Sequence, residues 1–285
     1  MANYTAADVK ALRDKTGVGM MDVKKALDEA QGDAAKAEEI LRIHGAKAAA
    51  KREGRTAANG LVTSKVIDTE AGQRGVLIEV NSETDFVAKT DRFIKMAEEI
   101  LEVAIDSKAT TVEELLAAKL AEGTVADRVT EEIAVIGEKL EVSNLEVLEG
   151  EVVDAYMHRT DPDLPPQVGV LVATDEAGRD IAHDVAVHIA ALNPKYLNIE
   201  DVPADVVETE KRIATETTIA EGKPEKAVPK IVEGRMHGFY KQVVLLEQGW
   251  AREPKKSVKQ VIAEHGGKVT GFKRVRVGDS ATEEA

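Results

Sequence analysis

Apolar residues in the first 45 positions recur at helical spacing in three short segments, each followed by glycine. Their apolar positions are Val9 and Leu12; Met20, Val23, Ala26, Leu27 and Ala30; and Ala37, Ile40 and Leu41. Gly45 is expected to end the third helix. The pattern predicts a three-helix module over residues 1–45, with Met20 in its core and Met21 on its surface as a candidate contact.

Residues 46–59 change character, because they are rich in Ala, Lys and Arg and contain no large apolar side chain. Such a stretch cannot build a packed face, so we predict a solvated, partly helical linker. Its positive charge is short and diluted by alanine, which makes a nucleic-acid role here weak.

From residue 60 onward, strand-like alternation is followed by helical spacing, and this succession occurs twice. The matching segments are 60–66 with 150–156, 75–77 with 169–171, 93–104 with 181–192, 112–115 with 199–202, and 137–140 with 267–269. The alternation of the last strand slips near Ser143 and Asn144 in the first copy, and a similar slip follows Phe272 in the second. Each copy therefore predicts a hairpin, a helix, a connection, a helix and a final strand.

The repeat predicts an α+β fold. Each copy forms an antiparallel three-stranded sheet with helices on one face, and the two subdomains lie side by side. The first subdomain is assigned to residues 60–149, and the second to residues 150–202 and 251–278. Residues 279–285 are assigned to an acidic tail.

The second copy contains an insertion, residues 203–250, that the first copy lacks. Val206, Ile213 and Ala220 are spaced seven apart along one expected helix, and Gly222-Lys-Pro224 reverses the chain. The helix that returns after this reversal has an apolar stripe of Val228, Ile231, Val232 and Met236. These patterns predict a projecting antiparallel helical hairpin, a coiled coil, whose returning helix begins after Pro229.

The stretch NSETDFVAK, residues 81–89, lies between a predicted buried strand and a predicted helix. Phe86 is conspicuous in this polar turn, because only 3% of the chain is aromatic. Its residue type alone leaves two interpretations open: a lid folded back on the core, or an apolar wedge presented to another protein. The corresponding turn of the second copy, 174–179, has no aromatic residue, so the fold does not require a lid there. The repeat therefore favours the wedge.

Composition narrows the class of partner. The net charge is −14, with 52 acidic against 38 basic residues, so nucleic acid and anionic membranes are poor candidates. The chain lacks Cys, and its start lacks the basic and apolar regions of a signal peptide. No run of 18 apolar residues occurs, so we expect a soluble, cytoplasmic protein without a membrane span.

Motifs for enzymatic chemistry are absent from the sequence. Neither GxGxxG nor GxxxxGK[ST] occurs, so no dinucleotide or phosphate loop is indicated. His183 and His188 are five residues apart, unlike a His-x-x-x-His metal pair, and His188 is interpreted as a core residue. We therefore expect no cofactor, no metal and no catalytic residue, and a protein-binding function rather than an enzyme.

Three segments carry a resemblance to a known family: VKALRDKTGVGMMDVKKALDEAQGD at 9–33, TDFVAK at 84–89 and KPEKAVPKIVEGRM at 223–236. The chain resembles bacterial elongation factor Ts from about residue 3 to Gly278. Its first 45 residues also resemble a ubiquitin-associated-type module, which this family carries without a ubiquitin role. The resemblance implies that the additional C-terminal module of some members is missing here.

The resemblance implies guanine nucleotide exchange on elongation factor Tu, the GTPase that delivers aminoacyl-tRNA to the ribosome. In the family, the residue matching Phe86 inserts near the magnesium site of that GTPase, and Thr84, Asp85 and Val87 flank it here. The remaining expected partner contacts are Met21, Lys24, Ile136, Gly137 and His158. The second subdomain and the hairpin are expected to hold the far domain of the partner, in a 1:1 or 2:2 complex. The alternative function is an adaptor that binds partners without changing the rate of nucleotide release.

Overall fold

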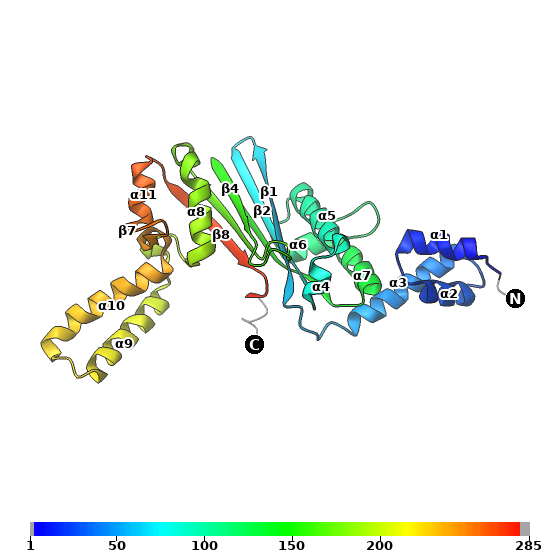
Figure 1. Cartoon of the computed structure of the whole chain (residues 1–285), viewed down its shortest axis with the longest axis horizontal. Helices are drawn as coiled ribbons and strands as arrows, with labels where there is room; N and C mark the ends of the chain where they lie inside the picture. The colour runs from blue at the N-terminus through cyan, green and yellow to red at the C-terminus, as the bar shows by residue number, and fades with distance from the viewer. Residues whose placement is uncertain (1–2, 280–285) are drawn as a thin grey trace.

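The computed structural model describes residues 3–279, which form helices and antiparallel sheets and confirm the α+β class. The molecule is elongated, with the helices of residues 6–50 at one end, those of residues 204–243 at the other, and the larger sheets between them (Figure 1). Apart from Asp279, the predicted acidic tail lies outside the described residues.

The N-terminal module consists of α1 (Ala6–Thr16), α2 (Met20–Glu29) and α3 (Ala34–Ala50). The predicted core positions are buried, or partly buried in the case of Ile40, except that Met20 is 48% exposed, so its assignment to the core was wrong. Met20 is the first residue of α2, ahead of the turn whose side chains face the module's core.

The prediction that α3 ends at Gly45 was also wrong. The glycine instead allows close packing on another helix, since a Cβ there would lie 3.1 Å from that of Ala134, and the alanines that follow favour helix.

The first large sheet has the strand order β1 (Asn59–Thr69), β2 (Gly72–Ser82) and β3 (Leu140–Gly150). One face is covered by α5 (Asp91–Ser107), α6 (Val112–Ala117) and α7 (Val125–Ile136), and α3 packs on α7. The short helix α4 (Asp85–Ala88) lies between β2 and α5. A β-bulge next to Ser143 accounts for the predicted slip in alternation, because Val80 pairs with Val142 and Glu79 with Asn144.

The second large sheet has the order β4 (Val152–His158), β5 (Val168–Thr174) and β8 (Val269–Arg276). Its helical cover is formed by α8 (Arg179–Leu192) and α11 (Val258–Glu264). A small ribbon of β6 (Gly249–Trp250) and β7 (Glu253–Ser257) precedes α11. Short 3₁₀ turns occupy Glu176–Gly178, Ile199–Asp201, Glu225–Ala227 and Leu245–Glu247.

The two large sheets pack against each other through the faces that the helices leave uncovered. The subdomains are therefore stacked, and the prediction that they lie side by side was wrong. Leu77 of β2 and Leu171 of β5 belong to one buried cluster between the sheets. Glycines permit the close approach, since a Cβ added at Gly169 would lie 2.5 Å from Leu77 Cδ1. Every residue of β5 is buried, and most of β2 is too, because each central strand is covered on both faces.

The insertion forms a helical hairpin of α9 (Ala204–Ala220) and α10 (Val228–Val243), joined through Gly222 at φ 71°. Val232 and Met236 are buried as predicted, but they face Ala214 rather than Ile213, which is 44% exposed. The apolar face of α9 therefore lies one position further along the chain than predicted. Helix α10 begins at Val228, ahead of Pro229, because a first turn tolerates proline.

Candidate functional site

Phe86 projects from α4, the single helical turn that follows β2. Thr84 caps this turn, its hydroxyl oxygen accepting the Val87 N–H at 3.4 Å. Phe86 is 70% exposed, while the partly buried Val87 packs against the core of the first sheet. The Lys89 ammonium lies 4.8 Å from the centre of the Phe86 ring. The lid interpretation is therefore wrong, and insertion of Phe86 into a partner stays a prediction.

A carboxylate just ahead of β3, the strand paired with β2, fixes the start of the turn. Glu138, which follows the end of α7, accepts the Thr84 N–H at 3.0 Å through one oxygen and the Thr84 hydroxyl at 2.7 Å through the other. A bidentate, charge-assisted contact of this kind restrains both position and orientation. The backbone that presents Phe86 is thus attached to the end of α7.

A second carboxylate makes the reciprocal contact. Glu83 accepts the Lys139 N–H at 2.6 Å, and the Arg55 guanidinium lies 3.2 Å from it. The Lys139 N–H, followed by Arg55, lowers the pKa of Glu83 below its ordinary value. This carboxylate is charged at neutral pH and is held by groups from two other segments.

These contacts place Ile136 and Gly137 next to the turn in the folded chain. Gly137 ends α7 in the left-handed conformation, with φ 83°, and is exposed. Its carbonyl oxygen accepts Arg52 Nε–H at 2.9 Å. Ile136 is partly buried against the core. Two of the predicted contact segments therefore form one connected surface.

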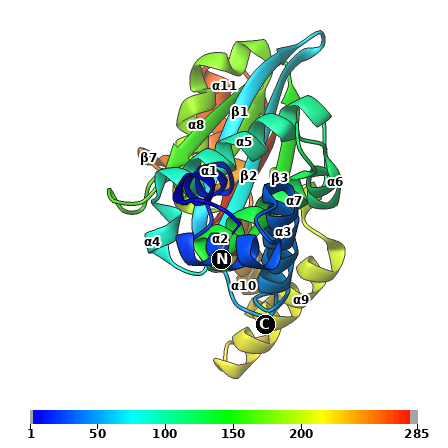
Figure 2. The same ribbon diagram turned by 90° about the vertical axis from the view of Figure 1, so that its right-hand side faces the viewer.

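The other predicted contact residues lie elsewhere on the molecule. Met21 is 64% exposed, and it and Lys24 lie on α2 of the N-terminal module. His158 is exposed at the end of β4, with its Nδ1 3.0 Å from the Tyr156 hydroxyl oxygen. The residues on either side of His158 line a hollow of about 350 Å³ that also includes Lys89. Figure 2 shows α4 at the edge of the helical layer, on the side away from α6.

Sequence reasoning missed the residues that hold this surface together: Glu83, Glu138, Arg52 and Arg55. Glu138 lies 54 positions from Thr84. Glu83 precedes Thr84, and Glu138 follows Gly137, and nothing in these short neighbourhoods indicates a long-range contact. The only available signal was the position of Glu83 and Glu138 directly next to two predicted contact segments.

The site consists of an exposed aromatic side chain on a turn that Glu83 and Glu138 brace. Within residues 3–279 no group of three or more His, Asp or Glu side chains is placed to hold a metal ion. In that same part of the chain, every helix is too short or too polar to cross a bilayer. An exposed aromatic on a rigid support is typical of proteins that act by binding another protein.

Comparison with known proteins identifies the particular family. The family model described as elongation factor TS matches residues 83–279. A protein named elongation factor Ts from Arthrobacter sp. (strain FB24) is 60% identical over 281 residues, covering 98% of this chain and 100% of the relative. Proteins of the same name from Micrococcus luteus and Bifidobacterium longum subsp. infantis are 58% and 50% identical, covering 98% and 99% of this chain and 100% of each relative. The chain belongs to the elongation factor Ts family, which implies a role in translation elongation.

Proposed function

We propose that this protein is a guanine nucleotide exchange factor that binds GDP-bound elongation factor Tu and promotes GDP release, so that GTP can rebind. The observation that carries the proposal is the exposure of Phe86, at 70%, on a turn that Glu83 and Glu138 brace. A large apolar side chain gains free energy when it leaves water, so Phe86 favours insertion into a partner over solvent exposure.

In the proposed mechanism, Phe86 enters the GTPase beside its magnesium and phosphate site, with Thr84, Asp85 and Val87 around it. The exchange factor forms and breaks no covalent bond, so it is not an enzyme in the chemical sense. It binds the nucleotide-free partner more tightly than the GDP-bound one, and by reciprocity its binding weakens GDP by the same factor. This difference in affinity comes from the displaced metal coordination in the GTPase and from the turn around Phe86, which is already formed before binding.

Several contact regions are needed, because one side chain cannot offset a tightly held nucleotide. Nanomolar GDP affinity corresponds to about 12 kcal/mol, whereas ordinary allosteric coupling contributes about 1–3 kcal/mol. We assign the remaining contacts to Met21 and Lys24 of the module, Ile136 and Gly137 beside the turn, and His158 of the second sheet. The hairpin and the second subdomain hold the far domain of the partner, in the cytoplasm where translation occurs.

Release of a fluorescent GDP analogue from elongation factor Tu, followed by stopped flow, tests the proposal. Phe86→Ala is expected to bind the partner and to accelerate release at least about tenfold less than the unsubstituted protein, as for a central interface aromatic. Ile43→Ala removes another exposed apolar side chain, 47% exposed on α3, which carries none of the assigned contacts, and is expected to leave the rate unchanged. An unimpaired Phe86→Ala variant would exclude the wedge.

The adaptor alternative is distinguished by the same experiment. It predicts binding to elongation factor Tu with no change in the rate of GDP release at any concentration of the unsubstituted protein. Acceleration by the unsubstituted protein excludes the adaptor, whatever the behaviour of the Phe86 variant.

A further inference from the structure

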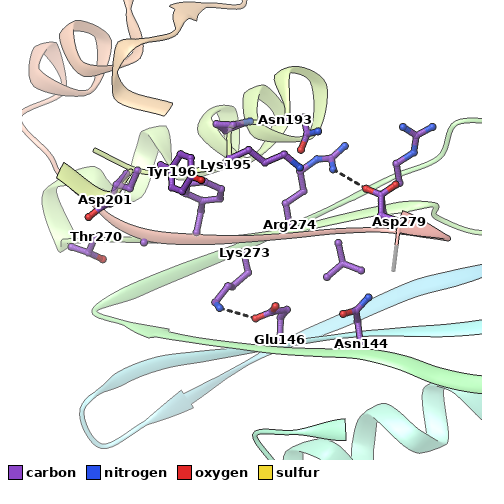
Figure 3. A pocket seen from close by; sticks show the side chains of 16 residues that line it. Asn144, Glu146, Asn193, Lys195, Tyr196, Asp201, Thr270, Lys273, Arg274 and Asp279 are labelled. Atoms are coloured by element: carbon purple, nitrogen blue, oxygen red, sulfur yellow. Dashed lines mark ion pairs between the residues drawn. The ribbon is translucent and has the colours of Figure 1, made fainter. Parts of the chain in front are cut away.

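A second site lies away from the Phe86 turn, in a cavity of about 580 Å³ beside β8 (Figure 3). One wall is β8 itself, another is the loop that follows α8, and residues of β3 complete the lining. The cavity therefore lies where three segments from distant parts of the chain meet. In Figure 3 the long side chains of Lys195 and Arg274 extend from different walls toward the same space.

Arg274 is the unusual residue of this cavity. Its side chain is only 10% exposed, and its Nε is buried without a hydrogen-bond partner among the described residues. Its ion-pair contact is with Asp279, whose Oδ2 lies 3.8 Å from Nη1, beyond hydrogen-bond distance. A guanidinium carries five donors, and buried donors in folded proteins are nearly always paired. Arg274 therefore requires an acceptor that the described residues do not supply.

The charges around Arg274 also favour an anionic ligand. Burial is the main cause that lowers the pKa of Arg274; the charge of Asp279 raises this pKa, and the charge of Arg276 lowers it. Lys195 is exposed and, within residues 3–279, forms no ion pair. Of the acidic lining residues, Glu146 pairs with Lys273 at 2.7 Å, and Asp201 accepts the Asn198 N–H at 2.8 Å. Among the described residues, the lining therefore holds four basic side chains, those of Lys195, Lys273, Arg274 and Arg276, against the three acidic ones of Glu146, Asp201 and Asp279, in a chain whose net charge is −14.

The wall opposite β8 is fixed by backbone hydrogen bonds. The N–H groups of Lys195 and Tyr196 both donate to the Val243 carbonyl oxygen, at 2.8 and 3.0 Å. The Tyr196 carbonyl oxygen accepts the Leu245 N–H at 2.8 Å. The cavity is therefore preformed, and little conformational freedom is lost when a ligand binds.

We infer that this cavity binds a small oxyanion, a phosphate or carboxylate group, with Arg274 as its buried partner and Lys195 and Arg276 at its rim. A planar guanidinium matches two oxygens of either group, and one of the two bonds would pair the buried Nε–H of Arg274. A bound anion would connect β8 to the loop after α8. This site is independent of the exchange activity proposed for the Phe86 turn.

Titration of the full-length protein with inorganic phosphate tests this inference, with sodium chloride at matched ionic strength as the reference. We expect saturable binding by calorimetry and a shift of the Arg274 Nε–Hε signal in ¹⁵N NMR spectra. Arg274→Gln should weaken binding at least about tenfold, the loss expected for charge-assisted hydrogen bonds. Lys195→Gln and Arg276→Gln should weaken it less.

Arg212→Gln is the matched control, because it removes the same charge from the exposed face of α9, where Arg212 pairs with Glu216. It should bind phosphate as the unsubstituted protein does. Succinate in place of phosphate distinguishes the two oxyanion sources, since the tighter ligand identifies the group that the cavity accepts. If Arg274→Gln does not fold, the NMR signal and the two rim variants decide the result. No saturable response to either anion, or an equal response in the Arg212 and rim variants, would overturn the inference.

Discussion

At the scale of single residues, the position of Phe86 depends on two carboxylates that exchange contacts where β2 ends and the paired strand β3 begins. Glu138 binds the backbone N–H of Thr84, and Glu83 binds that of Lys139. Each carboxylate accepts a backbone N–H just outside a strand, which the pairing of β2 with β3 leaves without a partner. His188 of α8 is also buried and paired: its ring stacks on Trp250, with the ring centres 5.2 Å apart, and its Nε2 lies 2.9 Å from Gln248 Oε1. Its interpretation as a core residue is confirmed.

Glu83→Gln is expected to lower the free energy of unfolding by about 1 kcal/mol at pH 7, because a charge-assisted bond becomes a neutral one. The folded state lowers the pKa of Glu83, so its stabilising contribution is complete above the ordinary value and is lost as the pH falls through the lowered one. The difference between the two proteins should therefore be constant from pH 6 to 8 and should shrink below about pH 4.3. Urea unfolding at several pH values measures it.

Glu102→Gln is the control for that substitution. Glu102 pairs with Lys65 at 2.7 Å, but both side chains are about half exposed, and such surface pairs contribute little. The expected change is below about 0.5 kcal/mol at every pH. An equal effect of both substitutions would mean that the Lys139 contact does not stabilise the turn.

At the scale of elements, the hairpin of α9 and α10 depends on a small apolar cluster. Ala214, Val232 and Met236 are its buried members, and the adjacent Thr218 satisfies its own buried hydroxyl by donating to the Ala214 carbonyl oxygen at 2.6 Å. Because few residues hold the two helices together, we expect the hairpin to open locally before the sheets unfold.

Met236→Ala is expected to destabilise the hairpin by about 2 kcal/mol, the lower end for truncation of a buried methionine. Hydrogen exchange in α9 and α10 should accelerate, while exchange in β2 and β5 should not change. Ile213→Ala, at a position 44% exposed, should alter exchange by less than about 0.5 kcal/mol. Equal acceleration in the central strands would show that the hairpin does not open independently.

At the scale of the whole molecule, contact between the sheets joins the two halves of the repeat. Gly75 and Gly169 lie at this contact, and a Cβ at either position would lie within 3.0 Å of side-chain atoms from the opposite sheet. The glycines therefore set the distance between the sheets. A residue with a side chain would force the two cores apart.

Gly169→Ala is expected to destabilise the protein by about 1–3 kcal/mol through overpacking. The matched control is Gly234→Ala in α10, where an added Cβ meets no atom within 4 Å and should stabilise the helix by about 0.5–1 kcal/mol. Thermal and urea unfolding should give opposite signs for the two substitutions. A neutral Gly169→Ala would mean that the sheets can separate without loss.

The sequence by itself determined the local structure of this protein. Alternation and helical spacing predicted both three-stranded units, the bulge near Ser143 and the returning face of the hairpin, because these depend on residues near each other in the chain. The comparison of the two repeats also predicted that Phe86 is not a core lid, and its 70% exposure agrees.

Tertiary structure decided what local patterns cannot encode. The face on which the sheets stack, the extension of α3 past Gly45 and the one-position shift of α9 all depend on which surface a neighbouring element covers. The bracing of Thr84 by Glu138 joins residues 54 positions apart, and the buried Nε of Arg274, without a hydrogen-bond partner among the described residues, becomes apparent only inside a folded cavity. Hydrophobic periodicity specifies that a face is buried, but packing and hydrogen-bond satisfaction in three dimensions select its partner.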